Sequence, residues 1–229
     1  MAPETFTLST CTVSDVPDMI NVHLRAFSSD YFGSFVFPRE AISDEEMHRW
    51  LVSRFTALFS KREVHTFKIT EDSTGRMAAF LRWTFPHVLT EEEEKEREKQ
   101  KVDREKQKAE TGHDPNWPVG ANLEICDEKF GGLDRLQEKY VDKKETYVAN
   151  LLATDPAYQR KGLATRLLKH VLDMADEEKR KVYIEATPAG HPVYLKLGFK
   201  DLDMVSVDLS RWGGKQIGIN RILMRDPIS

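Results

Sequence analysis

The chain has 229 residues, of which 40% are apolar, and carries a formal net charge of −4 with a pI near 6.0. This composition can bury a sizeable core, and the negative balance disfavours broad binding to nucleic acid. The two cysteines, Cys11 and Cys126, lack metal-ligand spacing, and no apolar run approaches the roughly 20 residues that a membrane span needs. We therefore expect a cytoplasmic protein, a monomer or homodimer, that holds no metal and binds neither nucleic acid nor membrane.

The first 85 residues are predicted to alternate strands and helices. The elements expected are, in chain order, a strand over 6–11, a helix from the N-cap Ser14 to Phe27, a helix from a capping box at 43–46 to about Ser60, and a hairpin of strands 64–70 and 76–85. The loop expected over 28–38 is rich in aromatic residues. Two interpretations stay open for it, a wall of a binding pocket and a hydrophobic plug over the core.

Residues 90–120 differ from the rest of the chain. Between Glu91 and Glu110 there are nine acidic and seven basic residues, and only Val102 and Ala109 are apolar. Such a segment cannot bury a face, so it is expected to be an insertion, either a solvated helix or a disordered segment.

The second half of the chain is predicted to alternate strands and helices again. The elements expected are a short helix over about 134–143, a strand from Thr146 to Pro156, a helix over 163–178, a strand over 181–186, a helix over 188–197, and strands over 199–209 and 216–225. Alternation of this kind indicates an α/β domain with a mixed sheet.

The most informative segment is Gln159-Arg160-Lys161-Gly162-Leu163-Ala164. It lies between a predicted strand and a predicted amphipathic helix. The first N–H groups of a helix have no intrahelical partner and the dipole is positive there, so the segment is suited to bind phosphate. Gly162 allows an anion to approach the backbone closely.

This segment resembles the Gln/Arg-x-x-Gly-x-Gly/Ala signature of the GNAT superfamily of acyl-CoA N-acyltransferases, in which the loop holds the pyrophosphate of coenzyme A. The resemblance extends to fungal small-molecule members. It implies one domain over 1–229, with six to seven mostly antiparallel strands that splay between the fourth and fifth, flanking helices, and the 90–120 insertion between strands three and four. The residues that it implies for acetyl-CoA binding are Leu152, Ala153, Thr154, Gln159, Arg160, Lys161, Gly162, Leu163, Ala164, Thr165 and Tyr194.

A second resemblance lies downstream, where Tyr194-Leu195-Lys196-Leu197-Gly198-Phe199 is similar to the family's Tyr-x-x-x-Gly-Phe pattern. In that pattern the tyrosine is the general acid toward the departing thiolate, so the resemblance implies this role for Tyr194. A tyrosine at helical spacing beside leucines is also common in protein cores. The Asn that many members carry before this helix is absent from Ala189-Gly190-His191, which puts an Asn contact to the pantetheine arm in doubt.

The attacking amine must be neutral, and neutralising an alkylammonium of pKa about 10.4 at pH 7 costs about 4.6 kcal/mol. A general base is therefore useful. The candidates are Glu185 and His87, with Asp155 and His191 behind them, although a turn or surface role is an alternative for each.

The function expected is direct transfer of the acetyl group of acetyl-CoA to a small-molecule amine. The alternatives are acetylation of a protein or peptide amine, and a non-catalytic acyl-CoA-binding regulatory protein.

Overall fold

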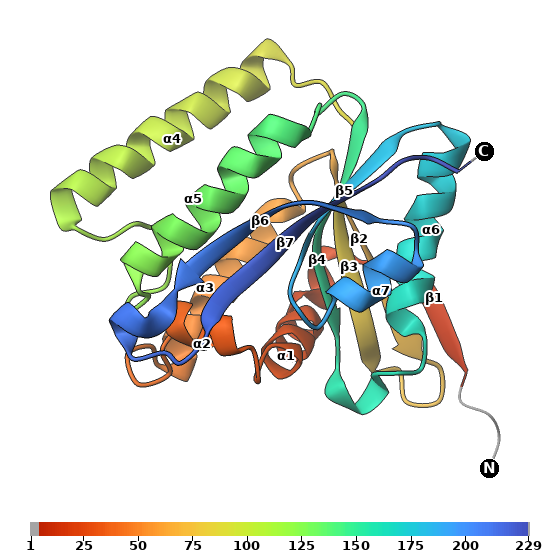
Figure 1. Ribbon diagram of the computed structural model, residues 1–229, viewed down its shortest axis with the longest axis horizontal. Helices are drawn as coiled ribbons and strands as arrows, with labels where there is room; N and C mark the ends of the chain where they lie inside the picture. Colours follow the sequence, from red (N-terminus) through yellow and green to blue (C-terminus); the bar gives the residue numbers. More distant parts are fainter. Residues whose placement is uncertain (1–4, 229) are drawn as a thin grey trace.

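The computed structural model describes residues 5–228 and is built around one seven-stranded sheet (Figure 1). The strand order is β1-β2-β3-β4-β5-β7-β6, and β4 and β5 form its parallel pair. The strands are β1 (Phe6–Thr10), β2 (Val64–Glu71), β3 (Met77–Thr84), β4 (Thr146–Thr154), β5 (Lys181–Ala186), β6 (Lys200–Asp208) and β7 (Ile217–Arg225). The mixed sheet, with mostly antiparallel pairing, confirms the predicted fold class.

Helices cover both faces of the sheet. One face carries α6 (Leu163–Glu177) and α7 (His191–Lys196), and the other carries α1 (Val16–Ala26), α2 (Tyr31–Val36), α3 (Asp44–Leu58) and α5 (Leu123–Tyr140). Short 3-10 turns occur at Val13–Asp15, Pro156–Tyr158 and Leu209–Trp212. Strand alternation directs Tyr147 and Ile184 toward α6, and Val148 and Tyr183 toward α5. Within residues 5–228 we find no helix whose length and apolar character would let it cross a membrane.

Several element boundaries differ from the sequence prediction. The N-terminal cap of the first helical segment is Thr12 rather than Ser14, because the backbone N–H of Thr12 donates to the Asp15 carboxylate at 2.8 Å. Residues 31–36, expected as loop, form the short helix α2. The helix expected over 134–143 begins eleven residues earlier, at Leu123, where the side chain of Asn122 accepts from the backbone N–H of Ile125.

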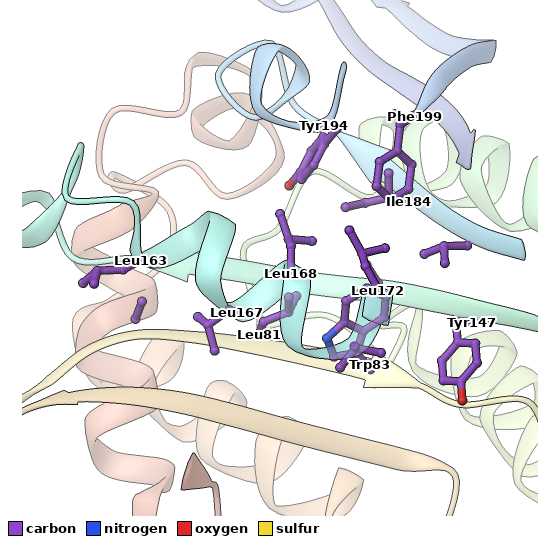
Figure 2. Close-up of a cluster of buried hydrophobic side chains, with 14 of the residues drawn as sticks. Leu81, Trp83, Tyr147, Leu163, Leu167, Leu168, Leu172, Ile184, Tyr194 and Phe199 are labelled. Atoms are coloured by element: carbon purple, nitrogen blue, oxygen red, sulfur yellow. The ribbon is translucent and has the colours of Figure 1, made fainter. Parts of the chain in front are cut away.

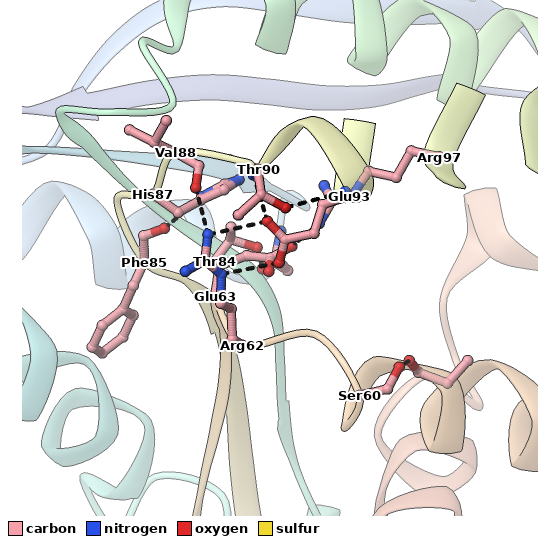
Figure 3. Close-up of polar contacts among 12 residues, drawn as sticks. Ser60, Arg62, Glu63, Thr84, Phe85, His87, Val88, Thr90, Glu93 and Arg97 are labelled. Atoms are coloured by element: carbon pink, nitrogen blue, oxygen red, sulfur yellow. Dashed lines mark hydrogen bonds and ion pairs between the residues drawn. The ribbon is translucent and has the colours of Figure 1, made fainter. Parts of the chain in front are cut away.

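The charged insertion is an ordered helix, α4 (Glu91–Thr111), with no buried residue, and it lies beside α5 (Figure 1). Thr90 and Glu93 cap it reciprocally. Figure 3 shows the ion pairs that join it to the start of β2, with Arg97 2.5 Å from Glu63 and Arg62 3.0 Å from Glu93. Of the two interpretations of this segment, the solvated helix is therefore confirmed.

The sheet opens between β4 and β5. These strands pair only from Thr146 opposite Lys181 to Ala149 opposite Ile184, and β5 then continues against β7 as far as Ala186. Opposite Arg82 and Trp83 of β3, β4 carries an extra residue, Asn150, which forms a bulge. The β5-facing edge of residues 150–154 is therefore left without a strand partner, which confirms the predicted splay.

A buried ion pair fixes α6 against β7. The guanidinium of Arg225, whose side chain is 4% exposed, donates to both carboxylate oxygens of Asp176 at 2.8 and 2.6 Å and to the Leu197 carbonyl at 2.9 Å. We expect Asp176→Ala to lower the free energy of unfolding by about 2–3 kcal/mol, because it leaves a buried guanidinium without its anion. Urea denaturation measures this.

The matched control is Asp173→Ala on the exposed side of the same helix, which we expect to change stability by less than about 0.5 kcal/mol. Arg225 also lowers the pKa of Asp176, so the stabilisation is present at neutral pH and is lost as the pH falls through that depressed pKa. Equal stabilities for the two variants would contradict the assignment of a stabilising role to the pair.

Candidate active site

A cleft of about 520 Å³ occupies the opening between β4 and β5. Its walls come from both faces of the sheet. They include the N-terminal end of α6, the unpaired half of β4, the end of β5, part of α7 and, from the opposite face, the middle of α5. The splay therefore connects the two faces of the sheet through one cavity.

One end of the cleft is formed by the start of α6. Gly162 is its N-cap with φ of 78°, and the preceding Arg160 also has a positive φ of 61°. A Cβ built on Gly162 would meet nothing within 4 Å, so the space in front of the helix is open. The residues of the predicted cradle that line the cleft are Gln159, Arg160, Gly162, Leu163, Ala164 and Thr165. Free backbone N–H groups and the positive helix end suit this space to an anion.

Lys161 is placed differently from its neighbours. Its ammonium lies 5.7 Å from the ring centroid of Tyr158 and 6.0 Å from that of Phe6. Its side chain packs toward β1, so only its backbone can serve the role predicted for it in the cradle.

The unpaired half of β4 forms one wall of the cleft. Asn150, Leu151, Leu152 and Thr154 line it, whereas Ala153 is 1% exposed and packs in the core beneath α1. Only the backbone of Ala153 can serve the predicted role. The hydroxyl of Thr154 is buried and has no hydrogen-bond partner within residues 5–228. The cleft thus contains an unsatisfied polar atom that a bound amide could satisfy.

Tyr194 reaches the cleft from α7. Its side chain is 6% exposed and packs on Phe199 with the rings 6.0 Å apart, over the leucines of α6 (Figure 2). In that view its hydroxyl points away from Phe199. A Cβ on Gly190 would lie 2.9 Å from this ring, so the glycine leaves room for it. Burial raises the pKa of Tyr194 to about 12, which keeps the hydroxyl protonated at neutral pH.

Glu185 enters the cleft from the other face of the sheet. It shares that face with Tyr183, whose hydroxyl donates to its carboxylate at 3.2 Å. Burial raises the pKa of Glu185 to about 7, against the opposing effects of this hydrogen bond and of Lys129. A carboxyl group with such a pKa can accept a proton near neutral pH. Tyr194 and Glu185 therefore flank the opening from opposite faces.

The other candidate bases lie elsewhere. His87 does not line the cleft; it follows β3 and lines a second cavity, where its backbone N–H donates to the Lys143 carbonyl and its Nδ1 lies 2.8 Å from the Phe85 carbonyl. Asp155 is 4% exposed, pairs with Arg25 at 2.7 Å and caps the following turn. His191 pairs with Asp201 at 2.8 Å.

Sequence reasoning missed several polar residues of the cleft, among them Lys129, Asn150, Thr187 and Asn220. Lys129 is 7% exposed and lies 4.2 Å from the ring centroid of Phe32. Burial lowers its pKa, whereas Asp30 and Glu185 raise it. The sequence did not identify Lys129 as a cleft residue, because the helix was predicted to begin after it. Asn150 could have been identified, since it is a polar residue that interrupts an apolar strand.

The aromatic segment 28–38 does both of the things proposed for it. Phe32 and Val36 are buried in the core, while Phe37 joins Phe27, Met47 and Trp50 around a pocket of about 300 Å³. Phe27 lines this pocket and the cleft alike. The aromatic pocket and the cleft therefore lie on either side of Phe27.

Comparisons with known proteins agree with this geometry. Residues 139–208, which contain the cradle and Tyr194, match the family described as "Acetyltransferase (GNAT) domain". No curated protein matches the sequence in a search.

Solved structures share the fold at low sequence identity. The C-terminal condensation domain of Ebony in complex with beta-alanyl-dopamine is 12% identical, with a TM-score of 0.65 over 98% of this chain and 100% of that one. The ribosomal-protein-S18-alanine N-acetyltransferase from Escherichia coli is 15% identical, with a TM-score of 0.54 over 98% and 96%. PaiA N-acetyltransferase from Thermoplasma acidophilum in complex with coenzyme A is 12% identical, with a TM-score of 0.53 over 97% and 99%. Residues 139–208 thus match the GNAT acetyltransferase domain, and the chain as a whole shares the fold of these solved structures.

Proposed function

We propose that the chain is one domain that transfers the acetyl group of acetyl-CoA directly to the amine of a small molecule, as a monomer or homodimer in the cytoplasm. The observation that carries this proposal is the placement of Tyr194 and Glu185 on opposite faces of one cleft, with an anion-binding helix end in the same cleft. The transfer needs no covalent intermediate on the enzyme.

The cleft fits acetyl-CoA. The open space at Gly162 and the start of α6 suit a pyrophosphate. The unpaired edge of β4 offers backbone groups to the pantetheine amides, and the unpartnered hydroxyl of Thr154 faces the same path. When bound, the thioester supplies the carbonyl carbon that the amine attacks.

Tyr194 and Glu185 each carry out one of the two proton transfers. Tyr194, protonated at neutral pH, donates a proton to the departing thiolate from the α6 face of the sheet. Glu185 accepts the proton of the amine from the α5 face. A cleft that reaches both faces lets the two substrates meet from opposite sides, which aligns the nucleophile with the carbonyl group.

The surroundings favour a small acceptor over a protein. The pocket of about 300 Å³ at Phe27 and a cavity of about 430 Å³ at Asn150 both adjoin the cleft. These volumes are typical of small-molecule sites. Beta-alanyl-dopamine in the Ebony structure is a small molecule, whereas the Escherichia coli neighbour acts on a ribosomal protein, so a protein amine is the second candidate.

Release of free thiol from acetyl-CoA tests the proposal. The purified protein is supplied with alkylamines, arylamines and peptides with free N-termini, and thiol is measured over time. We expect turnover with at least one amine of the small-molecule set. Turnover on peptides alone would transfer the proposal to protein acetylation, and coenzyme A binding without turnover would favour a non-catalytic binder.

Tyr194→Phe tests the proposed acid. We expect kcat to fall by about 100-fold while coenzyme A affinity changes little, because the ring is kept and only the proton donor is lost. The matched control is Tyr140→Phe, which removes a hydroxyl bonded to Asp203 outside the cleft and should leave kcat unchanged. An unaltered kcat in Tyr194→Phe would assign the residue to the core alone.

A further inference from the structure

A second cavity, of about 430 Å³, lies on the face of the sheet that carries α3 and α5. Residues of β2, β3 and β4 form its floor, and Arg97 of α4 reaches it through the ion pair to Glu63 (Figure 3). Its lining includes five basic side chains, from Arg or Lys, and three acidic ones. The cavity is thus locally positive in a chain whose net charge is −4.

Arg82 is the unusual residue of this cavity. It is a charged residue in the otherwise apolar strand β3, and its guanidinium lies 5.8 Å from the ring centroid of Phe55. The Nη1 atom is buried and has no hydrogen-bond partner in the described part of the chain. No ion pair to Arg82 forms within residues 5–228, and burial and the neighbouring Arg54 both lower its pKa. An unpaired, desolvated guanidinium is costly, so its presence calls for an anionic partner.

Arg54 supplies a second guanidinium to the same cavity. It lies 5.5 Å from the ring centroid of Trp50 and 5.7 Å from that of Trp117, and it makes no ion pair or hydrogen bond within residues 5–228. Asp134 of α5 lines the same cavity and acts on Arg54 electrostatically, but within residues 5–228 the two side chains form no ion pair or hydrogen bond.

The cavity adjoins the cleft at the splay. Asn150 lines both spaces, and its side chain is fixed by the Thr84 hydroxyl at 2.8 Å. Leu151, which lines the cleft, is the register partner of Arg82 in β3. Neighbouring strands lie about 4.8 Å apart, so Arg82 is one strand away from the opening where the amine is acetylated.

We propose that Arg82 and Arg54 bind an oxyanion carried by the acceptor, so that the substrate is an amine with a carboxylate or phosphate group a few bonds from its nitrogen. Guanidinium groups hold both oxyanions through paired N–H donors. Each guanidinium also packs on an aromatic ring, that of Arg82 at 5.8 Å from Phe55 and that of Arg54 at 5.5 Å from Trp50. This inference rests on the proposed function for the amine end of the acceptor, but the anion site can be tested without turnover.

Binding is measured first, by calorimetry with glutarate and with inorganic phosphate in the presence of coenzyme A. We expect one of the two probes to bind the wild-type protein and to bind Arg82→Gln about 10- to 100-fold more weakly, because a charged hydrogen-bonded contact is lost. The matched control is Arg49→Gln on α3, whose guanidinium pairs with Glu45 and Glu46 away from the cavity. If neither probe binds, or if the two variants lose equal affinity, the anion site is overturned.

The second measurement compares acceptors. We expect kcat/KM for 4-aminobutyrate or 2-aminoethyl phosphate to exceed that for butylamine by about 10-fold or more, and Arg82→Gln to remove this preference. The better of the two anionic amines identifies the carboxylate or the phosphate as the natural group. Turnover without any preference overturns the anion site and leaves the proposed function intact. If the probe binds in a way that depends on Arg82 but no amine is turned over, the anion site is supported and the proposed function is overturned.

Thermal stability separates a binding role from a structural one. We expect Arg82→Met, which replaces an unpaired charge by an apolar chain of similar length, to keep or raise the Tm of the ligand-free protein while it abolishes probe binding. If the guanidinium served stability alone, Arg82→Met would have a lower Tm than the wild type. A lower Tm together with unchanged probe binding would contradict the proposal.

Discussion

Gly162→Trp is expected to weaken coenzyme A binding about 1,000-fold, because two or three charge-assisted contacts of about 1.5 kcal/mol each are lost at the pyrophosphate. The α6 N-terminus presents free N–H groups to open space, and a Cβ at Gly162 would meet nothing within 4 Å. An indole attached there extends into the volume that the proposed anion requires. Calorimetry with coenzyme A measures the loss.

Backbone strain must be separated from this steric effect, since Gly162 has φ of 78° and any other residue there is strained. Gly75 provides the matched control. It has φ of 71°, likewise with nothing within 4 Å of a built Cβ, and it lies in the β2–β3 turn. Gly75→Trp should cost similar stability and leave coenzyme A affinity unchanged. Equal loss of affinity in both variants would sink the assignment of the cradle.

The parts of the site that could be predicted are those encoded locally. The segment Gln159–Ala164 depends on one strand end, one glycine and one helix start, all within six residues, and the structure places five of these six at the cleft. Tyr194 was predicted by the same kind of local pattern. The splay was expected only through the family resemblance, because strand pairing joins residues that lie far apart in sequence.

The parts that could not be predicted depend on long-range packing. The sequence predicts only a short helix over about 134–143, whereas α5 begins at Leu123 and runs through two glycines. Gly132 packs against Val205 of β6, where a Cβ would lie 3.1 Å from the valine methyl groups. The longer helix brings Lys129 to the cleft and Asp134 to the second cavity. Arg82 is a charged residue among the mostly apolar residues of β3, but only the fold shows that its Nη1 is buried without a hydrogen-bond partner in the described residues 5–228.

The last prediction concerns Glu185, which burial brings to a pKa of about 7 on the acceptor side of the opening. We expect Glu185→Gln to lower kcat for an alkylamine by about 100- to 1,000-fold, because the amide cannot accept the proton that the ammonium must lose. An arylamine is already neutral at pH 7 and gains little from a base. Its kcat should therefore fall by less than about 10-fold in the same variant, which makes the arylamine an internal control for folding and cofactor binding.

The pH dependence makes the same argument independently. In the wild type, kcat for the alkylamine should rise with pH as Glu185 ionises and level off above about 7, and this rise should be absent from Glu185→Gln.

The stability of the wild type should fall, rather than rise, over the same pH range. A folded-state pKa above the ordinary value near 4.5 means that the folded protein holds an extra proton between these pH values, so wild-type stability falls as the pH rises through that window. Glu185→Gln should lack this decline and be no less stable than the wild type at pH 8. A variant that retains the alkylamine limb, or that loses both substrates equally, would show that the base is another group.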